Sequence, residues 1–333
     1  ERWEYVIGRL RAFLISFGEA KLNLNEVCFF DLVPERFLKE YCDIKTLITQ
    51  DVLERCEKPD NYDFLVGLTK LVSSIEAQSL NIDLSCITNQ MTSLRVREFA
   101  KKVQSKTQYI KYNVFGTVTG RLTTKKTSFP ILTFPKDMRS ILKPNNDFFI
   151  ELDFNAAELR TLLSLSGVEQ PEIDIHEWNA KNVYDGKADR EEAKKKIFAW
   201  LYNPESRDKL ASQKYNRELI LKQHYDGSQI STFFNRTIDA DPHRALNYVI
   251  QSTTSDLFLR RALKIHDMLK GKKSYISCMI HDSLVMDFSL EDKGSLMDII
   301  DTFSDTDLGK FKTNVSVGDN FGNLEKREII WKR

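Results

Sequence analysis

The sequence predicts an α+β fold, in which a helical N-terminal part precedes a sheet built mainly from the second half of the chain. The first observation is helical spacing of apolar residues within 1–108, for example at Phe64, Leu68 and Leu71. The second is that later segments are apolar and rich in β-forming residues, as buried strands are. These segments are 148–154, 274–280 and 284–288.

Composition narrows the class of protein before any motif is considered. The 333 residues are 41% apolar and 29% charged, which is a globular composition and excludes wholesale disorder. The 49 Lys and Arg nearly balance the 48 Asp and Glu, so the chain is not uniformly basic and a polyanion site would need local clustering. The five cysteines are widely spaced without a CxxC, and no apolar run is long enough for a bilayer. We therefore expect free thiols, a reducing cytoplasmic location and no membrane partner.

The N-terminal third is expected to be mostly helical. Pro34 stands where the first turn of a helix would begin. Further residues then recur at helical spacing, namely Leu38, Tyr41, Leu47, Ile48 and Leu53.

A basic, loop-like stretch follows at 101–143. It holds ten Lys and Arg against one acid, Asp137, within a chain whose net charge is only +1. A solvated face is the plain interpretation of such a run, but Gly116, Gly120 and many hydroxyl residues favour contact with phosphates.

The remaining elements follow in order. The run 148–154 is expected to be a buried strand that delivers Asp153 at its end. His281, Asp282 and Ser283 form a tight turn between two strands. We expect helices at 156–165, 174–185, 189–202, 204–225, 242–269 and 291–303, and a last strand near 312–317.

Asp153 and Asp282 both lie at the ends of predicted strands, so they would converge if these strands pair in one sheet. Two carboxylates with few other ligands suit Mg²⁺, which keeps several waters and takes further oxygens from a phosphate. Two such ions would serve phosphoryl transfer. The alternative is that each aspartate only caps a turn.

The predicted helix 189–202 carries a mixed face. Arg190, Lys194, Phe198 and Tyr202 are spaced by four, so they lie near one side of the helix. Cations bind a triphosphate and a flat ring stacks on a base. The alternative is an ordinary amphipathic helix with a basic end.

Two further polar groups suit contact with nucleic acid. Thr119-Gly120-Arg121 would let a guanidinium reach a groove from a polar loop. Asn247 and Gln251, one turn apart on a predicted helix, present two amides that match minor-groove acceptors, although ordinary surface polarity would explain them equally.

In combination these segments resemble the family A (DNA polymerase I-like) DNA polymerases. The resemblance covers about 113–321, with the matches in the family's order throughout. Residues 153–160 resemble motif A, 190–202 the fingers helix, and 280–282 motif C. The primer loop is similar to 119–122, and the motif before the fingers helix to 174–176. The helix before motif C is similar to 247–253, and the C-terminal strand to 315–321.

The resemblance implies a right-hand polymerase fold with an antiparallel palm sheet and a helical thumb and fingers. It implies an N-terminal helical region including the thumb at 1–112, palm at 113–173 and 245–333, and fingers at 174–244. The implied activity is template-directed DNA synthesis, in which dNTPs are added to a primer 3′-OH with release of pyrophosphate. Small size and altered motifs suggest a compact phage or plasmid enzyme, active in the cytoplasm of a bacterial or phage-infected cell.

It also implies roles for individual residues. Asp153 and Asp282, with the backbone carbonyl of Phe154, would hold two Mg²⁺. The residues that would bind the dNTP are Arg190 and His176 at the outer phosphates, Lys194 as phosphate contact and proton donor, Phe198 at the base, Tyr202 at the template position and Glu158 below the sugar. The residues that would contact primer–template DNA are Arg121, Asn247, Gln251 and His281.

This chain departs from the family pattern at several positions. Ala156 stands where motif A has Gln, Ser283 where motif C has an acid, Asn203 where the fingers helix is followed by Gly, and His243 where an Arg precedes Gln251. These changes affect the primer contacts more than the metal site. The sequence shows no proofreading nuclease, which needs several clustered acids.

Two other functions stay open. A single-subunit RNA polymerase or primase-like enzyme often has His-Asp-Ser in motif C, as residues 281–283 do here, but Glu158 and Phe198 argue for DNA synthesis. A polymerase fold without activity could serve as a DNA-binding subunit, although both metal-binding acids are present.

Overall fold

The computed structural model describes residues 1–24, 27–105, 108–203 and 205–327. The chain divides into two compact units, Glu1–Asp63 and Phe64–Arg333. This division falls inside the region 1–112 that the sequence analysis treated as one. Of the predicted basic stretch, Lys106 lies outside the described residues, as does the side chain of Lys102.

The N-terminal unit is helical, as predicted, and has a small core of its own. Val6 packs there with Phe37, whose ring lies 4.9 Å from that of Phe13. Leu47 and Leu53 keep the predicted helical spacing but are exposed, so periodicity here marks a helix and not a buried face. The helices are α1 (Arg2–Glu19), α2 (Phe29–Leu32) and α3 (Glu35–Arg55), and α4 (Tyr62–Glu76) begins where the division falls.

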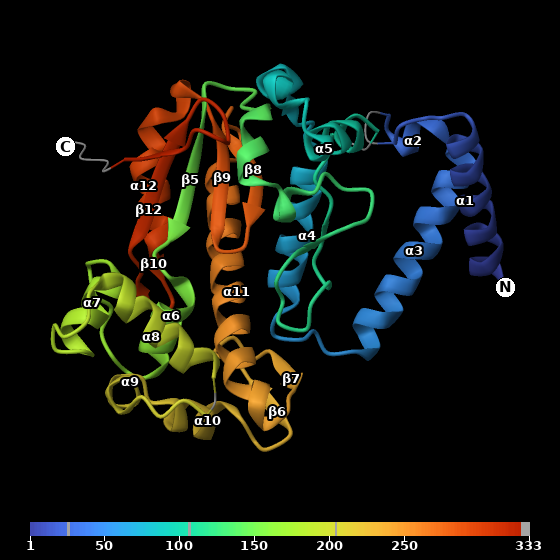
Figure 1. Ribbon diagram of the computed structural model, residues 1–333. Helices are drawn as coiled ribbons and strands as arrows, with labels where there is room; N and C mark the ends of the chain where they lie inside the picture. The colour runs from blue at the N-terminus through green and yellow to red at the C-terminus, as the bar shows by residue number, and fades with distance from the viewer. Residues whose placement is uncertain (25–26, 106–107, 204, 328–333) are drawn as a thin grey trace. The chain divides into compact units, whose positions relative to one another are not determined.

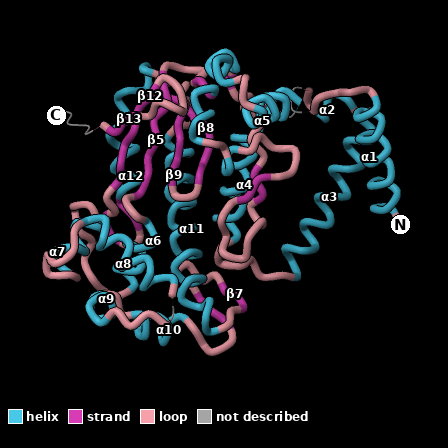
Figure 2. The backbone as a smooth tube through the Cα atoms, viewed as in Figure 1, coloured by secondary structure: helices cyan, strands magenta, loops and turns pink. Residues whose placement is uncertain are grey.

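The larger unit is centred on a five-stranded antiparallel sheet with strand order β13-β12-β5-β9-β8 (Figures 1 and 2). All four predicted strands and the hairpin are confirmed. The strands are β5 (Phe148–Phe154), β8 (Tyr275–Ile280), β9 (Ser283–Phe288), β12 (Thr313–Gly318) and β13 (Glu325–Lys326).

One face of this sheet is buried under helices. Phe154 of β5 stacks at 4.2 Å on Phe303 of α12 (Leu296–Ser304), and Phe258 of α11 (Pro242–Met268) meets the same ring at 6.2 Å. Because side chains alternate along a strand, Glu151 and Asp153 point to the other face. The strand therefore sends Ile150, Leu152 and Phe154 to the face covered by helices. Its two acids share the other face with buried Phe149.

A second hydrophobic cluster lies around the helices that follow β5. It joins side chains of α6, α7, α8 and α11, among them Leu159, Ile175, Trp200 and Val249. The elements around it are α6 (Ala157–Leu165), α7 (Ile175–Asn182), α8 (Arg190–Tyr202), α9 (Lys209–Lys214), α10 (Arg217–His224), β6 (Gln229–Ser231) and β7 (Thr237–Asp239).

The single helix predicted at 204–225 is instead two short helices. Asp208 caps α9 by accepting from the Ala211 backbone N–H, and Asn216 caps α10 by accepting from that of Leu219. Between them, buried Tyr215 donates its hydroxyl to Asn179 at 2.6 Å. Two capping residues and one inward-facing tyrosine thus end one helix and begin another. The high charge of this segment gave no sign of that break.

Shorter elements complete the larger unit. The 3-10 helices are η1 (Leu84–Gln90), η2 (Ile131–Thr133), η3 (Lys136–Ile141) and η4 (Leu290–Ser295), and α5 spans Leu94–Ser105. The small strands are β1 (Asn81–Ile82), β2 (Tyr112–Asn113), β3 (Thr123–Thr124), β4 (Leu142–Lys143), β10 (Asp305–Thr306) and β11 (Gly309–Lys310).

Candidate active site

The two predicted metal-binding aspartates meet at one end of the sheet. Asp153 is paired in register with Ser283, the first residue of β9, and Asp282 immediately precedes that serine. The turn between β8 and β9 consists of His281 and Asp282, with His281 in the left-handed region at φ 54°. Adjacent pairing of β5 and β9 thus brings together two acids that are 129 positions apart in the sequence.

Burial raises the pKa of both acids. Burial raises the pKa of Asp153 to about 6, against the lowering effect of Asn314, whose Nδ2 donates to Oδ2 at 3.2 Å. The neighbouring charges of Glu151 and Asp282 raise it further. Burial likewise raises the pKa of Asp282, which Arg121 opposes. The site therefore holds negative charge that the protein itself compensates poorly.

This donor set fits Mg²⁺. Among the residues that the structure describes, no group of three or more His, Cys, Asp or Glu side chains could hold an ion by itself. Two hard carboxylates are nevertheless what Mg²⁺ needs when waters and substrate phosphates supply its other oxygens. A divalent cation would also favour the ionised form of both carboxylates, against the burial that raises their pKa values.

Glu158 connects two other predicted site residues. Its Oε1 accepts from Arg121 Nη2 and its Oε2 accepts from the Tyr202 hydroxyl. A cavity of about 380 Å³ opens at this point. Six of the residues predicted from the sequence line it, namely Arg121, Glu158, Phe198, Tyr202, His281 and Asp282.

The cavity lies where the two hydrophobic clusters of the larger unit meet. Neighbouring residues of α6 belong to different clusters, Ala157 to that under the sheet and Leu159 to that around α8, and both line the cavity. A hollow between two packed cores has rigid walls on both sides, which suits a site that must hold a substrate in one orientation.

A half-buried ion pair supports the loop that carries Arg121. Arg236, in the turn between β6 and β7, donates to both carboxylate oxygens of Asp256 on α11, at 3.0 and 2.6 Å. The Arg236 guanidinium packs on Gly120, where an added Cβ would lie 2.6 Å from its Nη2. Gly120 also has φ +78°. Both the close approach of Arg236 and this backbone conformation therefore require glycine here.

The mixed face predicted on α8 is present. Arg190 and Lys194 are exposed, and the Phe198 ring is stacked with that of Tyr202, with centroids 5.9 Å apart. His176 of α7 lies 5.7 Å from Phe198 and is buried, and burial lowers its pKa. Its Nδ1 is buried without a hydrogen-bond partner among the described residues.

The remaining predicted contacts are less closely gathered. Asn247 and Gln251 lie one turn apart and partly exposed on α11, but no hydrogen bond between described residues joins them to Arg121. Part of the charge of the basic stretch is compensated within the protein, since Lys111 and Lys125 both pair with Glu76. The charge available for DNA is therefore smaller than the sequence count.

Sequence reasoning missed two residues beside the aspartates. Glu151 shares the sheet face of Asp153 and accepts from the Ser283 hydroxyl at 2.7 Å. Asn314 of β12 is paired in register with Asp153. The i, i+2 spacing of Glu151 and Asp153 in the strand was the available signal for the first. The role of Asn314 depends on strand register, which the sequence does not show.

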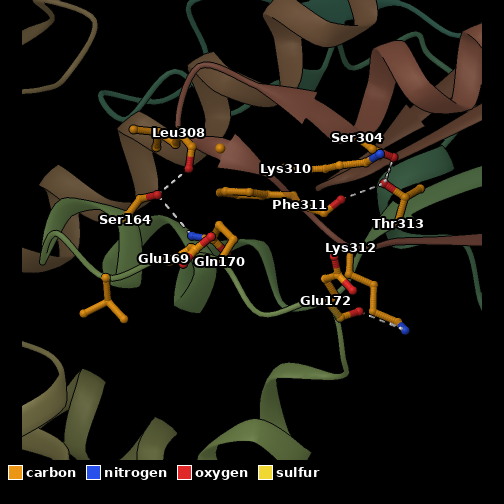
Figure 3. A pocket seen from close by; sticks show the side chains of 12 residues that line it. Ser164, Glu169, Gln170, Glu172, Ser304, Leu308, Lys310, Phe311, Lys312 and Thr313 are labelled. Atoms are coloured by element: carbon orange, nitrogen blue, oxygen red, sulfur yellow. Dashed lines mark hydrogen bonds between the residues drawn. The ribbon is translucent and has the colours of Figure 1, made fainter.

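A larger cavity, of about 580 Å³, lies elsewhere in this unit, between the segment after α6 and β11–β12 (Figure 3). Its wall carries charges of both signs, from the acid Glu172 and from the cations Lys310 and Lys312. The Ser164 hydroxyl donates a hydrogen bond to the Leu308 carbonyl. This cavity contains none of the predicted site residues. We place the candidate site in the smaller cavity because the predicted site residues line it, and cavity volume alone does not identify a site.

Comparison with known proteins shows the fold. No family model and no curated protein matches the sequence. Among solved structures, the POL domain of Pol1 from M. smegmatis, in complex with DNA primer-template and dNTP, is similar with a TM-score of 0.57 and 16% sequence identity. The match covers 69% of this chain and 51% of that chain, so this protein spans about half the length of its neighbour. The matching part of the chain therefore has a polymerase-like fold.

None of the helices in the described part of the chain has the length and apolar character needed to cross a membrane.

Proposed function

We propose that this protein is a DNA-directed DNA polymerase of family A type that adds dNTPs to a primer 3′-OH and releases pyrophosphate. The observation that carries the proposal is the convergence of six residues, predicted from four separate segments, on one cavity. The polymerase-like fold supports it independently. In this proposal the palm comprises 113–173 and 245–333, the fingers 174–244, and the region 1–112 includes the thumb.

Asp153 and Asp282, with the Phe154 carbonyl, would hold two Mg²⁺, which when bound activate the attacking hydroxyl and stabilise the leaving oxygen. The chain supplies the framework for this chemistry. Pairing of β5 with β9 fixes both carboxylates, and the hydrogen bond from Asn314 orients Asp153. The carboxylates must be ionised to bind a cation, so the cation and the proton compete for them.

The incoming nucleotide would lie along α8. Arg190 and Lys194 are exposed cations one turn apart, which suits successive phosphates, and His176 lies beside this face. Lys194 would donate a proton to the pyrophosphate as it leaves. Phe198 would stack on the base, with Tyr202 next to it at the template position.

Glu158 would act below the sugar. Its carboxylate lies in the cavity and is held on both oxygens by Arg121 and Tyr202, so it cannot turn aside easily to admit a ribose 2′-OH. Arg121 and His281 line the same cavity and would contact the primer end, with Asn247 and Gln251 along the minor groove.

Primer extension with dNTPs or rNTPs supplied separately tests the proposal. The protein should extend a primed template with dNTPs and Mg²⁺ only, and Glu158→Ala should narrow the preference for dNTPs by about a hundredfold, because a polar barrier to the 2′-OH is removed. The control is Asp298→Ala, an exposed acid on α12. Efficient use of rNTPs by the unaltered protein would favour RNA synthesis, and no extension with either would favour a DNA-binding subunit.

A further inference from the structure

Arg190 contacts two carboxylates of very different character. Its Nη2 donates to Asp174 Oδ2 at 3.0 Å, and its Nη1 donates to Glu191 Oε1. The side chain of Asp174 is 18% exposed, whereas that of Glu191 is 64% exposed. The two halves of one guanidinium therefore face a sheltered acid and a solvated one.

Asp174 is rigidly held. Its Oδ1 caps α7 by accepting from the backbone N–H groups of His176 and Glu177, at 2.9 and 3.1 Å. Its Oδ2 accepts from Asn155 Nδ2 at 2.9 Å in addition to Arg190. The hydrogen bond from Arg190, followed by those from Asn155 and the backbone, holds the pKa of this carboxyl well below its usual range despite partial burial. Asp174 therefore stays ionised and in one orientation.

Asn155 connects this carboxylate to the strand that ends in Asp153. Its backbone N–H donates to the Lys312 carbonyl at 2.9 Å, and its Oδ1 accepts from the Ile175 N–H at 2.9 Å. Fully buried Arg160 donates to both the backbone and side-chain oxygens of Asn155, at 2.9 and 3.2 Å. A continuous set of hydrogen bonds thus runs from the end of β5 to the guanidinium of Arg190.

Glu191 has no such support. It lies in the first turn of α8, and among the residues that the structure describes its hydrogen-bond partner is Arg190 alone. An exposed ion pair of this kind contributes little free energy and exchanges readily with a stronger anion. A phosphate offers the same guanidinium a better charge-assisted contact.

We propose that Asp174 is a positioning residue that, through Arg190, sets where the outer phosphates of the incoming nucleotide lie relative to β5, and that Glu191 holds Nη1 only until the triphosphate replaces it. The inference rests on the proposed function, because it takes Arg190 as a phosphate contact. It assigns opposite roles to two acids that touch the same side chain.

Asp174→Asn and Glu191→Gln are a matched pair for the test, since each removes one negative charge from beside Arg190 and keeps the shape of the side chain. The Asn variant also keeps an oxygen to cap α7. We expect Asp174→Asn to raise the KM for dNTP about tenfold, the size of a charge-assisted contact. Glu191→Gln should leave the KM unchanged or lower it, and primer–template affinity should be unaltered in both.

A double-mutant cycle shows whether Asp174 acts through Arg190. In an Arg190→Ala background, Asp174→Asn should change the KM no further. Asp208→Asn is the structural control, because Asp208 caps a helix in the same region and accepts from Tyr184 without touching Arg190. It should leave the KM for dNTP unchanged.

Binding of inorganic tripolyphosphate, followed by calorimetry, separates this inference from the proposed function. Weaker binding by Asp174→Asn but not by Glu191→Gln supports the inference even if the protein extends no primer, in which case only the polymerase proposal fails. Equal effects of the two substitutions, tighter binding by Asp174→Asn, or a full effect of Asp174→Asn without Arg190 would each overturn the inference.

Discussion

Both ends of the five-stranded sheet carry aspartates, and their surroundings differ sharply. At the end of β9, Asp287 is 1% exposed and accepts three hydrogen bonds. These come from the backbone N–H groups of Asn145 and Asn146, at 2.7 and 2.9 Å, and from the Tyr275 hydroxyl at 2.9 Å. Donors of the protein itself therefore satisfy the Asp287 carboxylate.

At the opposite end, the described residues donate one hydrogen bond to the Asp153 side chain, from Asn314, and none to that of Asp282. Both are partly buried, and both have raised pKa values. Burial of charge without donors costs stability, which folded proteins tolerate mainly where a ligand or cation uses the site. The comparison teaches that one end of the sheet satisfies its buried carboxylate within the protein, whereas the other end leaves two carboxylates with few donors, as the proposed metal site requires.

The largest expected contrast is in activity. Asp153→Ala and Asp282→Ala should each lower the rate of primer extension by about a thousandfold or more, since each removes a proposed ligand of the cation that would stabilise charge in the transition state. Asp287→Asn should keep near-normal activity in its folded fraction. Single-turnover primer extension, normalised to folded protein, measures this rate. Comparable losses of activity in the variants at both ends of the sheet would contradict the distinction between the two ends.

The free energy of unfolding should show the reverse order, with the larger loss at Asp287. Asp287→Asn replaces one of the two acceptor oxygens with an amide N–H₂, which then faces at least one inward-pointing donor. Leaving a buried donor unpaired costs roughly 1–3 kcal/mol. We therefore expect the free energy of unfolding to fall by about 2 kcal/mol. Urea denaturation followed by circular dichroism checks this, with Asp298→Asn as the exposed control. An unchanged midpoint would mean that the hydrogen bonds to Asp287 contribute little.

The smallest effect has the opposite sign. Burial holds the pKa of Asp153 at about 6, above its usual value, so its ionised form disfavours the folded state at neutral pH. In the presence of a chelator, Asp153→Asn should raise the free energy of unfolding by on the order of 1 kcal/mol. The same denaturation experiment applies, and a lower stability for this variant would contradict the view of Asp153 as an uncompensated charge.

Much of the candidate site could be predicted from the sequence because its residues lie at the ends of strongly patterned elements. Asp153 lies at the end of an apolar strand, Asp282 lies in a tight turn, and the face of α8 follows from spacing by four. Each of these is a local property, and local patterns determine local structure. The order of the segments then indicated how they would assemble.

The rest depends on contacts between distant segments. Asn314 reaches Asp153 only through the register of β12 on β5, and Asn155 reaches Asp174 only after α7 has packed beside the strand end. The break between α9 and α10 likewise depends on Tyr215 finding Asn179 in a buried position. No periodicity or composition encodes such partners, so they appear only in the folded chain.

Binding of Mn²⁺, detected by electron paramagnetic resonance, tests most directly the claim that the two aspartates hold a divalent cation. The unaltered protein, with primer–template and dNTP, should bind Mn²⁺ with an affinity that falls strongly in both Asp153→Asn and Asp282→Asn and persists in Asp287→Asn. Equal Mn²⁺ binding by all four proteins would contradict the account.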